Sequence, residues 1–287
     1  MKNVVLITGA SSGFGYFTAL TLLQKGHKVY ASMRDVEGKN LAAAQALSGA
    51  GAAVLSLDVT DETSIRQAID TLVAREGRLD VLINNAGVAC AGVSESFDAA
   101  QFSDMLDVNL VGMFRVTQAA LPTLRQQQRG LVINIGSILG RVNFPFFSLY
   151  GATKHAVEAL SEGMKYELSQ LGVDVVLVQP SAFPTSLYSN LIAPAHGEVS
   201  QSYGAANDIV AGISNTIAQS FEGAQAPDPQ EVAEGIVNLI NTPAGQRPAR
   251  QVVGASFGAD TVNEQVAPTQ AHLLEMMQLS GLAELKA

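Results

Sequence analysis

Short apolar runs alternate with longer stretches of helical periodicity along most of the chain. Each run is nearly continuous in valine, isoleucine and leucine, which is typical of strands buried on both faces of a parallel sheet. The alternation therefore predicts an α/β fold in which helices cover one doubly wound parallel sheet. The expected strands are Asn3–Ile7, Lys28–Ser32, Ala53–Leu57, Leu79–Ile83, Leu131–Ile135 and Val173–Val178.

The stretches between the apolar runs are long enough for helices, and Thr60 or Asp61 could cap one of them. We find no tandem repeat, low-complexity tract or long linker, so we expect one domain over residues 1–287. A C-terminal helical segment is expected at about Thr261–Ala287. The other expected helices are Gly13–Lys25, Asn40–Leu47, Asp61–Arg75, Gln101–Gln127 and Tyr150–Leu171.

One region, about residues 181–229, carries no strand pattern and is interrupted by proline and glycine. Within it Ile209, Ile213, Ile217 and Phe221 recur every four residues, as one apolar stripe on a helix. Long irregular segments that follow a strand are usually functional or disordered. We therefore predict a lid or substrate loop here, and a packed surface excursion without a special role is the alternative.

Composition narrows the function classes. Hydrophobic residues make up 47% and charged residues 15% of the 287 residues, which indicates a large buried core. The net charge of −9 repels phosphate groups, so binding to nucleic acid or to an anionic membrane is not expected. No apolar stretch approaches the length of a membrane span, and the one near the N-terminus is too short for a signal peptide. A cytoplasmic protein is expected.

Cysteine and histidine contribute little to the expected chemistry. The single cysteine, Cys90, cannot form an intramolecular disulfide, and we interpret it as an interior packing residue. The four histidines are scattered, without metal-ligand spacing, so no metal site is expected.

A glycine-rich turn, Thr8–Gly15, joins the first strand to the first helix. Its glycines permit unusual backbone angles and a close approach of the main chain to a ligand. The helix that follows presents free N–H groups and the positive end of its dipole, which suits a pyrophosphate. The residues expected to contact it are Gly9, Ser11, Ser12, Gly13, Phe14 and Gly15.

The same turn also fits the G-x-S-x-G elbow of serine hydrolases, with Ser11 as the nucleophile. The stretch Gly254–Gly258 fits that pattern as well, around Ser256. A hydrolase would need a late histidine, for which His272 is the candidate, and an acid before it. Because glycine and serine are common in turns, hydrolysis is kept as the weaker alternative.

The end of the second strand reads VYASMRD and bears on the choice of cofactor. A carboxylate at this point usually binds the ribose 2′-hydroxyl of NAD, whereas a cation accommodates the 2′-phosphate of NADP. Arg34 favours NADP, because a guanidinium matches the geometry of a phosphate. Asp35 leaves NAD open, since a shift of one residue would place a carboxylate there.

Three residues form a candidate proton-transfer set. Ser137 follows the fifth strand, Tyr150 begins a helix, and Lys154 lies one turn later on the same helix face. A nearby cation lowers the pKa of a tyrosine and favours the phenolate. Tyr150 could then exchange a proton with a carbonyl or alcohol oxygen, and Ser137 could hold that oxygen by a hydrogen bond.

Together with Asn84–Gly87 and Asn109, these motifs resemble the short-chain dehydrogenase/reductase family in order and spacing, from about Asn3 to Thr185. The resemblance implies a Rossmann fold, a grip of Lys154 on the ribose, and a helix bent at Asn109 to hold a relay water. Ser181 stands where the family commonly has glycine. The resemblance further implies cofactor contacts from Asp58, Val59, Asn85, Ala86, Gly87, Pro180, Phe183 and Thr185.

Aromatic and aliphatic residues near the site suggest the kind of substrate. No arginine or lysine occurs between Lys165 and Arg247, which disfavours a highly anionic substrate under the lid. We expect about half of the apolar candidates to line a pocket for a lipophilic ketone, aldehyde or secondary alcohol. The candidates are Phe144, Phe146, Phe147, Phe183, Leu187, Tyr188 and Leu191.

The sequence thus predicts an NADP(H)-preferring oxidoreductase that interconverts a lipophilic carbonyl compound and its alcohol. A non-catalytic NADP-binding redox sensor is the alternative from another class. Family members often pair through the helices corresponding to Gln101–Gln127 and Tyr150–Leu171, so a homodimer or homotetramer is expected. The small residues Ala152, Ala156, Ala159 and Gly163 would permit close approach on the second helix.

Overall fold

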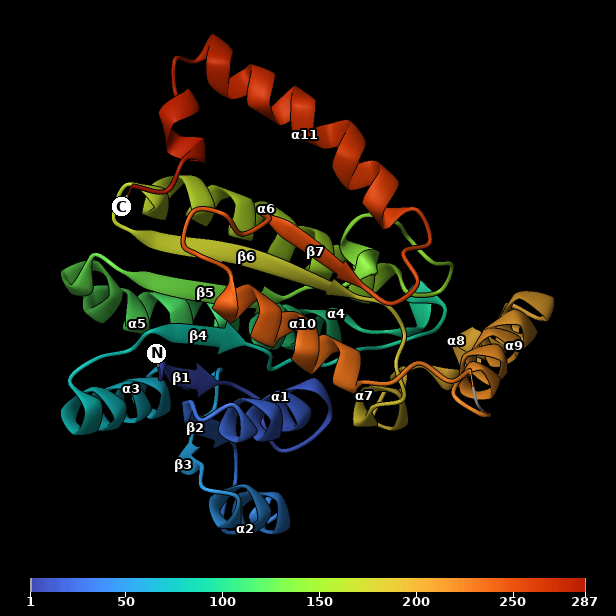
Figure 1. The fold of residues 1–287 in the computed structure, drawn as a ribbon. Helices are drawn as coiled ribbons and strands as arrows, with labels where there is room; N and C mark the ends of the chain where they lie inside the picture. Colours follow the sequence, from blue (N-terminus) through green and yellow to red (C-terminus); the bar gives the residue numbers. More distant parts are fainter. Residues whose placement is uncertain (1, 224, 287) are drawn as a thin grey trace.

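The computed structural model contains a seven-stranded sheet with helices on both faces (Figure 1). The structure describes residues 2–223 and 225–286. The strand order is β3-β2-β1-β4-β5-β6-β7, and each neighbouring pair is parallel. The predicted doubly wound parallel sheet is therefore confirmed. Its strands are β1 (Val4–Ile7), β2 (Lys28–Met33), β3 (Ala53–Ser56), β4 (Val81–Asn84), β5 (Gly130–Ile135), β6 (Val173–Pro180) and β7 (Arg250–Val253).

Among the elements that were not predicted from the sequence, two belong to the packed sheet and its covering helices. The edge strand β7 is only four residues long and begins with Arg250 and Gln251, so it lacks the apolar run of a central strand. It pairs with β6 in register, with Leu177 opposite Arg250 and Pro180 opposite Val253. The second element is α10 (Gln230–Asn241), which buries seven residues on the sheet.

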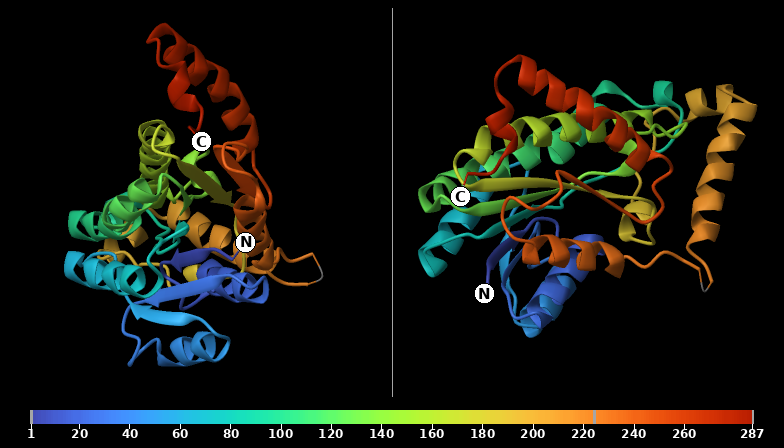
Figure 2. Two further views of the ribbon diagram at one scale, coloured as in Figure 1. Left: turned by 60° about the vertical axis from the view of Figure 1, so that its left-hand side comes forward. Right: turned by 45° about the horizontal axis from the view of Figure 1, so that its top comes forward.

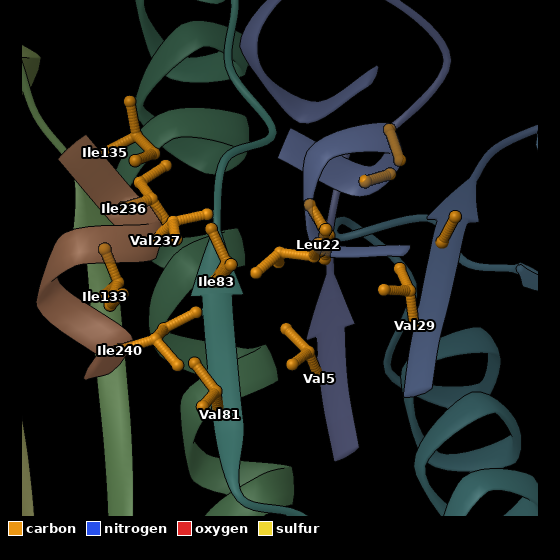
Figure 3. Close-up of a cluster of buried hydrophobic side chains, with 14 of the residues drawn as sticks. Val5, Leu22, Val29, Val81, Ile83, Ile133, Ile135, Ile236, Val237 and Ile240 are labelled. Carbon is orange, nitrogen blue, oxygen red and sulfur yellow. The ribbon is translucent and has the colours of Figure 1, made fainter. Parts of the chain in front are cut away.

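Both faces of the sheet are buried, which explains the unbroken apolar strands. One face packs against α1 (Gly13–Gln24), α2 (Leu41–Gly49) and α10. Figure 3 shows Ile236, Val237 and Ile240 of α10 directed toward Ile83 and Ile133 of the sheet. The opposite face is covered by α3 (Glu62–Glu76), α5 (Met113–Gln127) and α6 (Ser148–Ser169).

The helix expected at Gln101–Gln127 is interrupted. α4 (Ala99–Leu106) begins with a capping box between Asp98 and Gln101. A π-helical turn, η2 (Asp107–Gly112), separates it from α5. This turn contains Asn109, the residue at which the family resemblance implied a bent helix.

After β6 the chain leaves the sheet. The predicted lid region holds three helices, α7 (Ser186–Ser189), α8 (Gly197–Ser202) and α9 (Ala205–Ser220). α9 has no buried residue, and Figure 2 shows it standing apart from the sheet. The expected C-terminal helix is α11 (Ala259–Met276), followed by the short η4 (Ser280–Ala283) rather than continuing to the end. Across the described residues, no helix combines the length and hydropathy needed to span a membrane.

Candidate active site

A cavity of about 1430 Å³ lies at the carboxyl ends of the strands. In a doubly wound sheet this edge is where ligands bind, beside the switch in strand order between β1 and β4. Gly15 and Asn109 are the two predicted site residues that do not line it. The others do, namely Gly9, Ser11, Ser12, Gly13, Phe14, Arg34, Asp58, Val59, Asn85, Ala86, Gly87, Ser137, Tyr150, Lys154, Pro180, Phe183 and Thr185.

The glycine-rich turn fits the pyrophosphate of a dinucleotide. Gly9 has a φ of +66°, and a Cβ there would lie 2.8 Å from Ala86 Cα. A Cβ on Gly15 would lie 2.6 Å from the carbonyl oxygen of Gly9, which explains why this glycine supports the turn without lining the cavity. The Ser12 side chain accepts no hydrogen bond from the backbone of α1, so the first N–H groups of the helix remain available to an anion.

Asn85 fixes this turn against β4. Its Nδ2 donates to the carbonyl oxygens of Thr8 at 2.9 Å and Gly9 at 3.0 Å. The backbone N–H groups of Asn85 and Ala86 in turn donate to Thr8 Oγ1, at 3.0 and 3.1 Å. The cradle is therefore preorganised by hydrogen bonds between the ends of two adjacent strands.

Arg34 and Asp35 differ in how free their side chains are. The Arg34 side chain is 64% exposed, and its Nη1 lies 3.9 Å from Asp58 Oδ2. Asp35 has a φ of +46°, and its Oδ2 accepts a 2.7 Å hydrogen bond from the backbone N–H of Lys39. The carboxylate is thus engaged within its own turn. Lys39 also lines the cavity, a second cation that sequence reasoning missed because it lies in an irregular loop.

Asp58 and Val59 are held beside the cavity by local contacts. Asp58 Oδ1 accepts hydrogen bonds from the backbone N–H and the Oγ1 of Thr60, at 2.9 and 2.7 Å. Val59 packs on the π-helical turn, where a Cβ on Gly112 would lie 2.8 Å from its Cγ2. Glycine at position 112 therefore makes room for Val59.

Ser137, Tyr150 and Lys154 meet at the middle of the cavity. Tyr150 and Lys154 are buried, with 9% and 6% of their surfaces exposed. Lys154 Nζ donates to the carbonyl oxygen of Ile135 at 2.9 Å and lies 5.7 Å from the centroid of the Tyr150 ring. Ser137 follows β5 and lines the cavity with Tyr150, and its Oγ accepts the backbone N–H of Leu139 at 3.1 Å.

The direction of the Tyr150 pKa differs from the expectation that Lys154 would lower it. Burial raises the pKa of Tyr150, nearby Tyr188 raises it further, and only the hydrogen bond from Ser137 lowers it. Burial also lowers the pKa of Lys154 to about 8. Desolvation thus opposes the charged form of both groups. The structure thus holds Tyr150 as a phenol that can donate a proton to an oxygen in the cavity.

Asn109 acts behind the cavity wall. Its Oδ1 accepts the backbone N–H of Val88 at 2.8 Å, and its Nδ2 donates to the Val88 carbonyl at 2.9 Å. The same Nδ2 donates to Thr153 Oγ1 at 3.0 Å. Asn109 therefore joins the π-helical turn, the segment after β4 and the α6 turn between Tyr150 and Lys154.

The other end of the cavity is apolar. Of the seven predicted apolar candidates only Phe146 does not line it, since that residue has a φ of +66° and its carbonyl accepts the N–H of Gly92. Several lining residues with large apolar side chains were not predicted as pocket residues. They include Ile209, Ile213 and Ile217 of α9, Ile138 and Leu139 after β5, and Phe257, whose ring meets that of Phe144 at 5.3 Å.

The groups that a serine hydrolase would need are not assembled. His272 is 67% exposed on α11, and its Nδ1 lies 3.7 Å from Glu275. Ser11 lies at the start of α1, and Figure 1 shows these two helices on opposite sides of the sheet. Cys90 is buried, and burial raises the pKa of its thiol to about 11, consistent with a packing residue.

A pyrophosphate cradle beside a buried tyrosine–lysine pair is the arrangement of a dinucleotide-dependent oxidoreductase. Comparison with known proteins agrees. The profile of the family described as short chain dehydrogenase matches residues 3–195. The chain therefore belongs to the short-chain dehydrogenase/reductase family of NAD(P)-dependent enzymes that act on CH–OH and C=O groups.

Two curated relatives and one solved structure are similar to this chain. A 3-ketodihydrosphingosine reductase of Bacteroides thetaiotaomicron is 38% identical over 66% of this chain, and the match spans slightly less than two thirds of that relative, 66%. A 17-beta-hydroxysteroid dehydrogenase type 1 of Mus musculus is 34% identical over 84% of this chain and 71% of its own length. A short-chain dehydrogenase from Streptomyces avermitilis is 32% identical over 98% of both chains, with a TM-score of 0.74.

Proposed function

We propose that this protein is an NADPH-preferring reductase of a neutral, lipophilic ketone or aldehyde, able to run in reverse as an alcohol dehydrogenase. The observation that carries the proposal is the position of Tyr150, between the pyrophosphate cradle and the apolar end of one cavity. A proton donor at this junction can reach an oxygen whose carbon faces the cofactor.

The proposal assigns one role to each polar residue where the cofactor end and the apolar end of the cavity meet. A nicotinamide held by the cradle and Lys154 would supply or accept a hydride at the substrate carbon. In reduction, Tyr150 gives its proton to the substrate oxygen, so the carbonyl gains one hydride and one proton and becomes an alcohol. Ser137 orients that oxygen by a hydrogen bond. Lys154, buried one turn from Tyr150, would hold the cofactor ribose.

The preference for NADPH rests on the exposed cation that follows β2. Arg34 is exposed at the cavity, whereas the neighbouring carboxylate of Asp35 is engaged by the backbone of Lys39. Lys39 adds a second positive charge to the same end of the cavity. A 2′-phosphate would therefore meet cations, and the Asp58 carboxylate would be balanced by Arg34.

The lipophilic substrate and the lid are supported by the lining of the other end. Ile209, Ile213 and Ile217 of α9 line the same cavity as Phe144 and Phe257. α9 has no fully buried residue and meets the core only through partly buried side chains such as Ile213 and Ile217, as far as the structure describes it, so its movement would break few contacts. The two curated relatives carry names of enzymes acting on lipophilic carbonyl compounds or alcohols, which supports the same substrate class.

The first test measures the oxidation of NADPH and of NADH with a panel of apolar ketones and aldehydes, using wild type and Tyr150→Phe. The proposal expects turnover that favours NADPH and falls by a factor of about 100 or more in the variant, because the general acid is lost. Tyr166→Phe is the matched control, since Tyr166 lies on the same helix and hydrogen-bonds Glu162 instead. Tight NADPH binding without turnover of any carbonyl compound would favour the redox sensor.

We also propose that the chain forms a homodimer or homotetramer through α5 and α6. Ala152 and Ala159 are exposed on α6, and Val111 and Phe114 are exposed near the start of α5. Small residues beside apolar ones allow two helices to approach closely. Sedimentation of wild type and Ala159→Arg tests this, because a bulky charge there should shift the protein toward monomer.

A further inference from the structure

Tyr188 places a second phenol in the cavity that the proposed reaction does not use. It belongs to the short helix α7 and lines the cavity. Its ring meets that of Phe221 edge-on, with 5.1 Å between the centroids. It lies close enough to Tyr150 that charge on Tyr188 would raise the pKa of Tyr150. The two phenols therefore face the same space.

The segment that carries Tyr188 is tied to the pyrophosphate cradle. Ser186 Oγ donates to Ser12 Oγ at 2.7 Å, and Asn190 Nδ2 donates to the Ser186 carbonyl at 2.7 Å. The backbone N–H of Tyr188 donates to the Thr185 carbonyl at 3.2 Å. Ser186 thus ties α7 to the cradle, and the Tyr188 ring packs on Phe221, which follows the last residue of α9.

The hydroxyl of Tyr188 stands out among the hydroxyls at this end of the cavity. Thr216 Oγ1 donates to the Gly212 carbonyl and Ser220 Oγ to the Ile217 carbonyl, both within α9. Within residues 2–223 and 225–286, no protein group hydrogen-bonds the Tyr188 hydroxyl. Burial raises the pKa of Tyr188 to about 12, so this hydroxyl is a neutral donor.

An apolar substrate that fills the cavity would strip water from this hydroxyl. A buried polar group left without a partner is costly, so the site favours a ligand that supplies one. Charged side chains line the cavity only at Lys154 and at the cofactor end, as far as the structure describes them, namely Arg34, Asp35, Lys39 and Asp58. The partner is therefore a neutral oxygen rather than a carboxylate.

We propose that Tyr188 is a specificity-determining residue that hydrogen-bonds a second, neutral oxygen of the substrate, separate from the oxygen that Tyr150 protonates. The preferred substrate is then an oxygenated lipophilic ketone, such as a β-keto ester or a hydroxyketone, rather than a plain hydrocarbon ketone. This inference rests on the proposed reductase function. It refines the substrate class of the same site.

The test compares two ketones of equal chain length, ethyl butyrylacetate, a β-keto ester, and pentyl propyl ketone. Tyr188→Phe retains the ring against Phe221 and removes only the hydroxyl. We expect kcat/KM for the keto ester to fall about tenfold, mostly through KM, and that for the plain ketone to stay within about twofold. Tyr203→Phe is the matched control, since its hydroxyl bonds Glu95 and the residue does not line the cavity.

Equal losses for both ketones, or no loss for either, would overturn the role of Tyr188 and leave the reductase intact. Calorimetric titration of both ketones into the protein saturated with NADP⁺ gives the same comparison without turnover. If wild type turns over neither ketone, nor any other in the panel, the reductase proposal fails. The ratio of the two affinities in wild type and Tyr188→Phe then still decides for or against the hydrogen bond.

Discussion

Glu158 is a buried carboxylate outside the cavity that contacts two arginines. It is 4% exposed and lies one turn after Lys154 on α6. Its Oε2 lies 2.8 Å from Arg250 Nε and 3.1 Å from Arg141 Nη2, and its Oε1 accepts a hydrogen bond from Gln179. One carboxylate thus joins the segment after Ser137, the helix of Tyr150, and strands β6 and β7.

Glu158→Gln keeps the shape of this side chain and removes its charge. Arg141 then loses the one carboxylate that contacts it in the described structure, while Arg250 retains Glu162 at 3.0 Å. Removing one partner of a buried pair typically costs about 3–5 kcal/mol. Because Arg250 keeps one partner, we expect the lower end, a loss of about 3 kcal/mol in the free energy of unfolding.

Urea unfolding, followed by circular dichroism, measures this loss. The control is Glu275→Gln, whose side chain is 78% exposed and pairs only with His272, so its effect should stay within about 0.5 kcal/mol. A loss below about 1 kcal/mol in Glu158→Gln would refute the reasoning, because it would mean that water or rearrangement already compensates both guanidinium groups. A changed slope of the transition would indicate an altered compactness instead.

Three further predictions concern the cavity. Gly9→Ala places a Cβ 2.8 Å from Ala86 Cα at a φ of +66°, so this variant should have a lower melting temperature that no longer rises when NADPH is added. The control Gly163→Ala, which has open space around the added Cβ, should keep the melting temperature and its rise with NADPH. Arg34→Leu should raise the KM for NADPH at least about tenfold and leave that for NADH within about twofold, measured by steady-state kinetics; equal effects on both would exclude a contact with the 2′-phosphate. Burial lowers the pKa of Lys154 from 10.5 to about 8, so its charged form opposes folding below pH 8 and this penalty fades as the pH rises toward 10.5. Lys154→Met should therefore be inactive yet about 1–3 kcal/mol more stable than wild type at pH 7, with a gap that narrows toward pH 10.5 in urea titrations, and a constant gap would argue against the buried charge.

The strands that are buried on both faces of the sheet could be predicted from their apolar sequences. β1, β4, β5 and β6 are covered on both faces, and their runs of valine, isoleucine and leucine identify them. β7 is an edge strand whose first three residues are only partly buried, so it lacks the run of apolar residues that identifies the other strands. The family resemblance did not extend to this part of the chain either.

The sequence predicted which residues meet at the candidate site better than it predicted their pKa values. Spacing brought Ser137, Tyr150 and Lys154 together, because strand ends and helix starts meet at one edge of a parallel sheet. The prediction that the pKa of Tyr150 is lowered was wrong. The direction of the shift depends on how deeply the cavity wall buries the phenol, which the spacing of residues does not reveal. Lys39 and Phe257 lie in irregular loops, where periodicity says nothing about which way a side chain points.

The charge cluster around Glu158 also has a consequence for biosynthesis. Arg141 and Glu158 emerge from the ribosome well before Arg250, and Asn263, which hydrogen-bonds both Arg141 and Gln179, emerges later still. Until those residues arrive, the helix that carries Tyr150 and Lys154 lacks its connection to the far edge of the sheet. A nascent chain stalled before Arg250 should therefore form the glycine-rich turn and pack α6 on β6, while Glu158 still lacks its ion pair with Arg250.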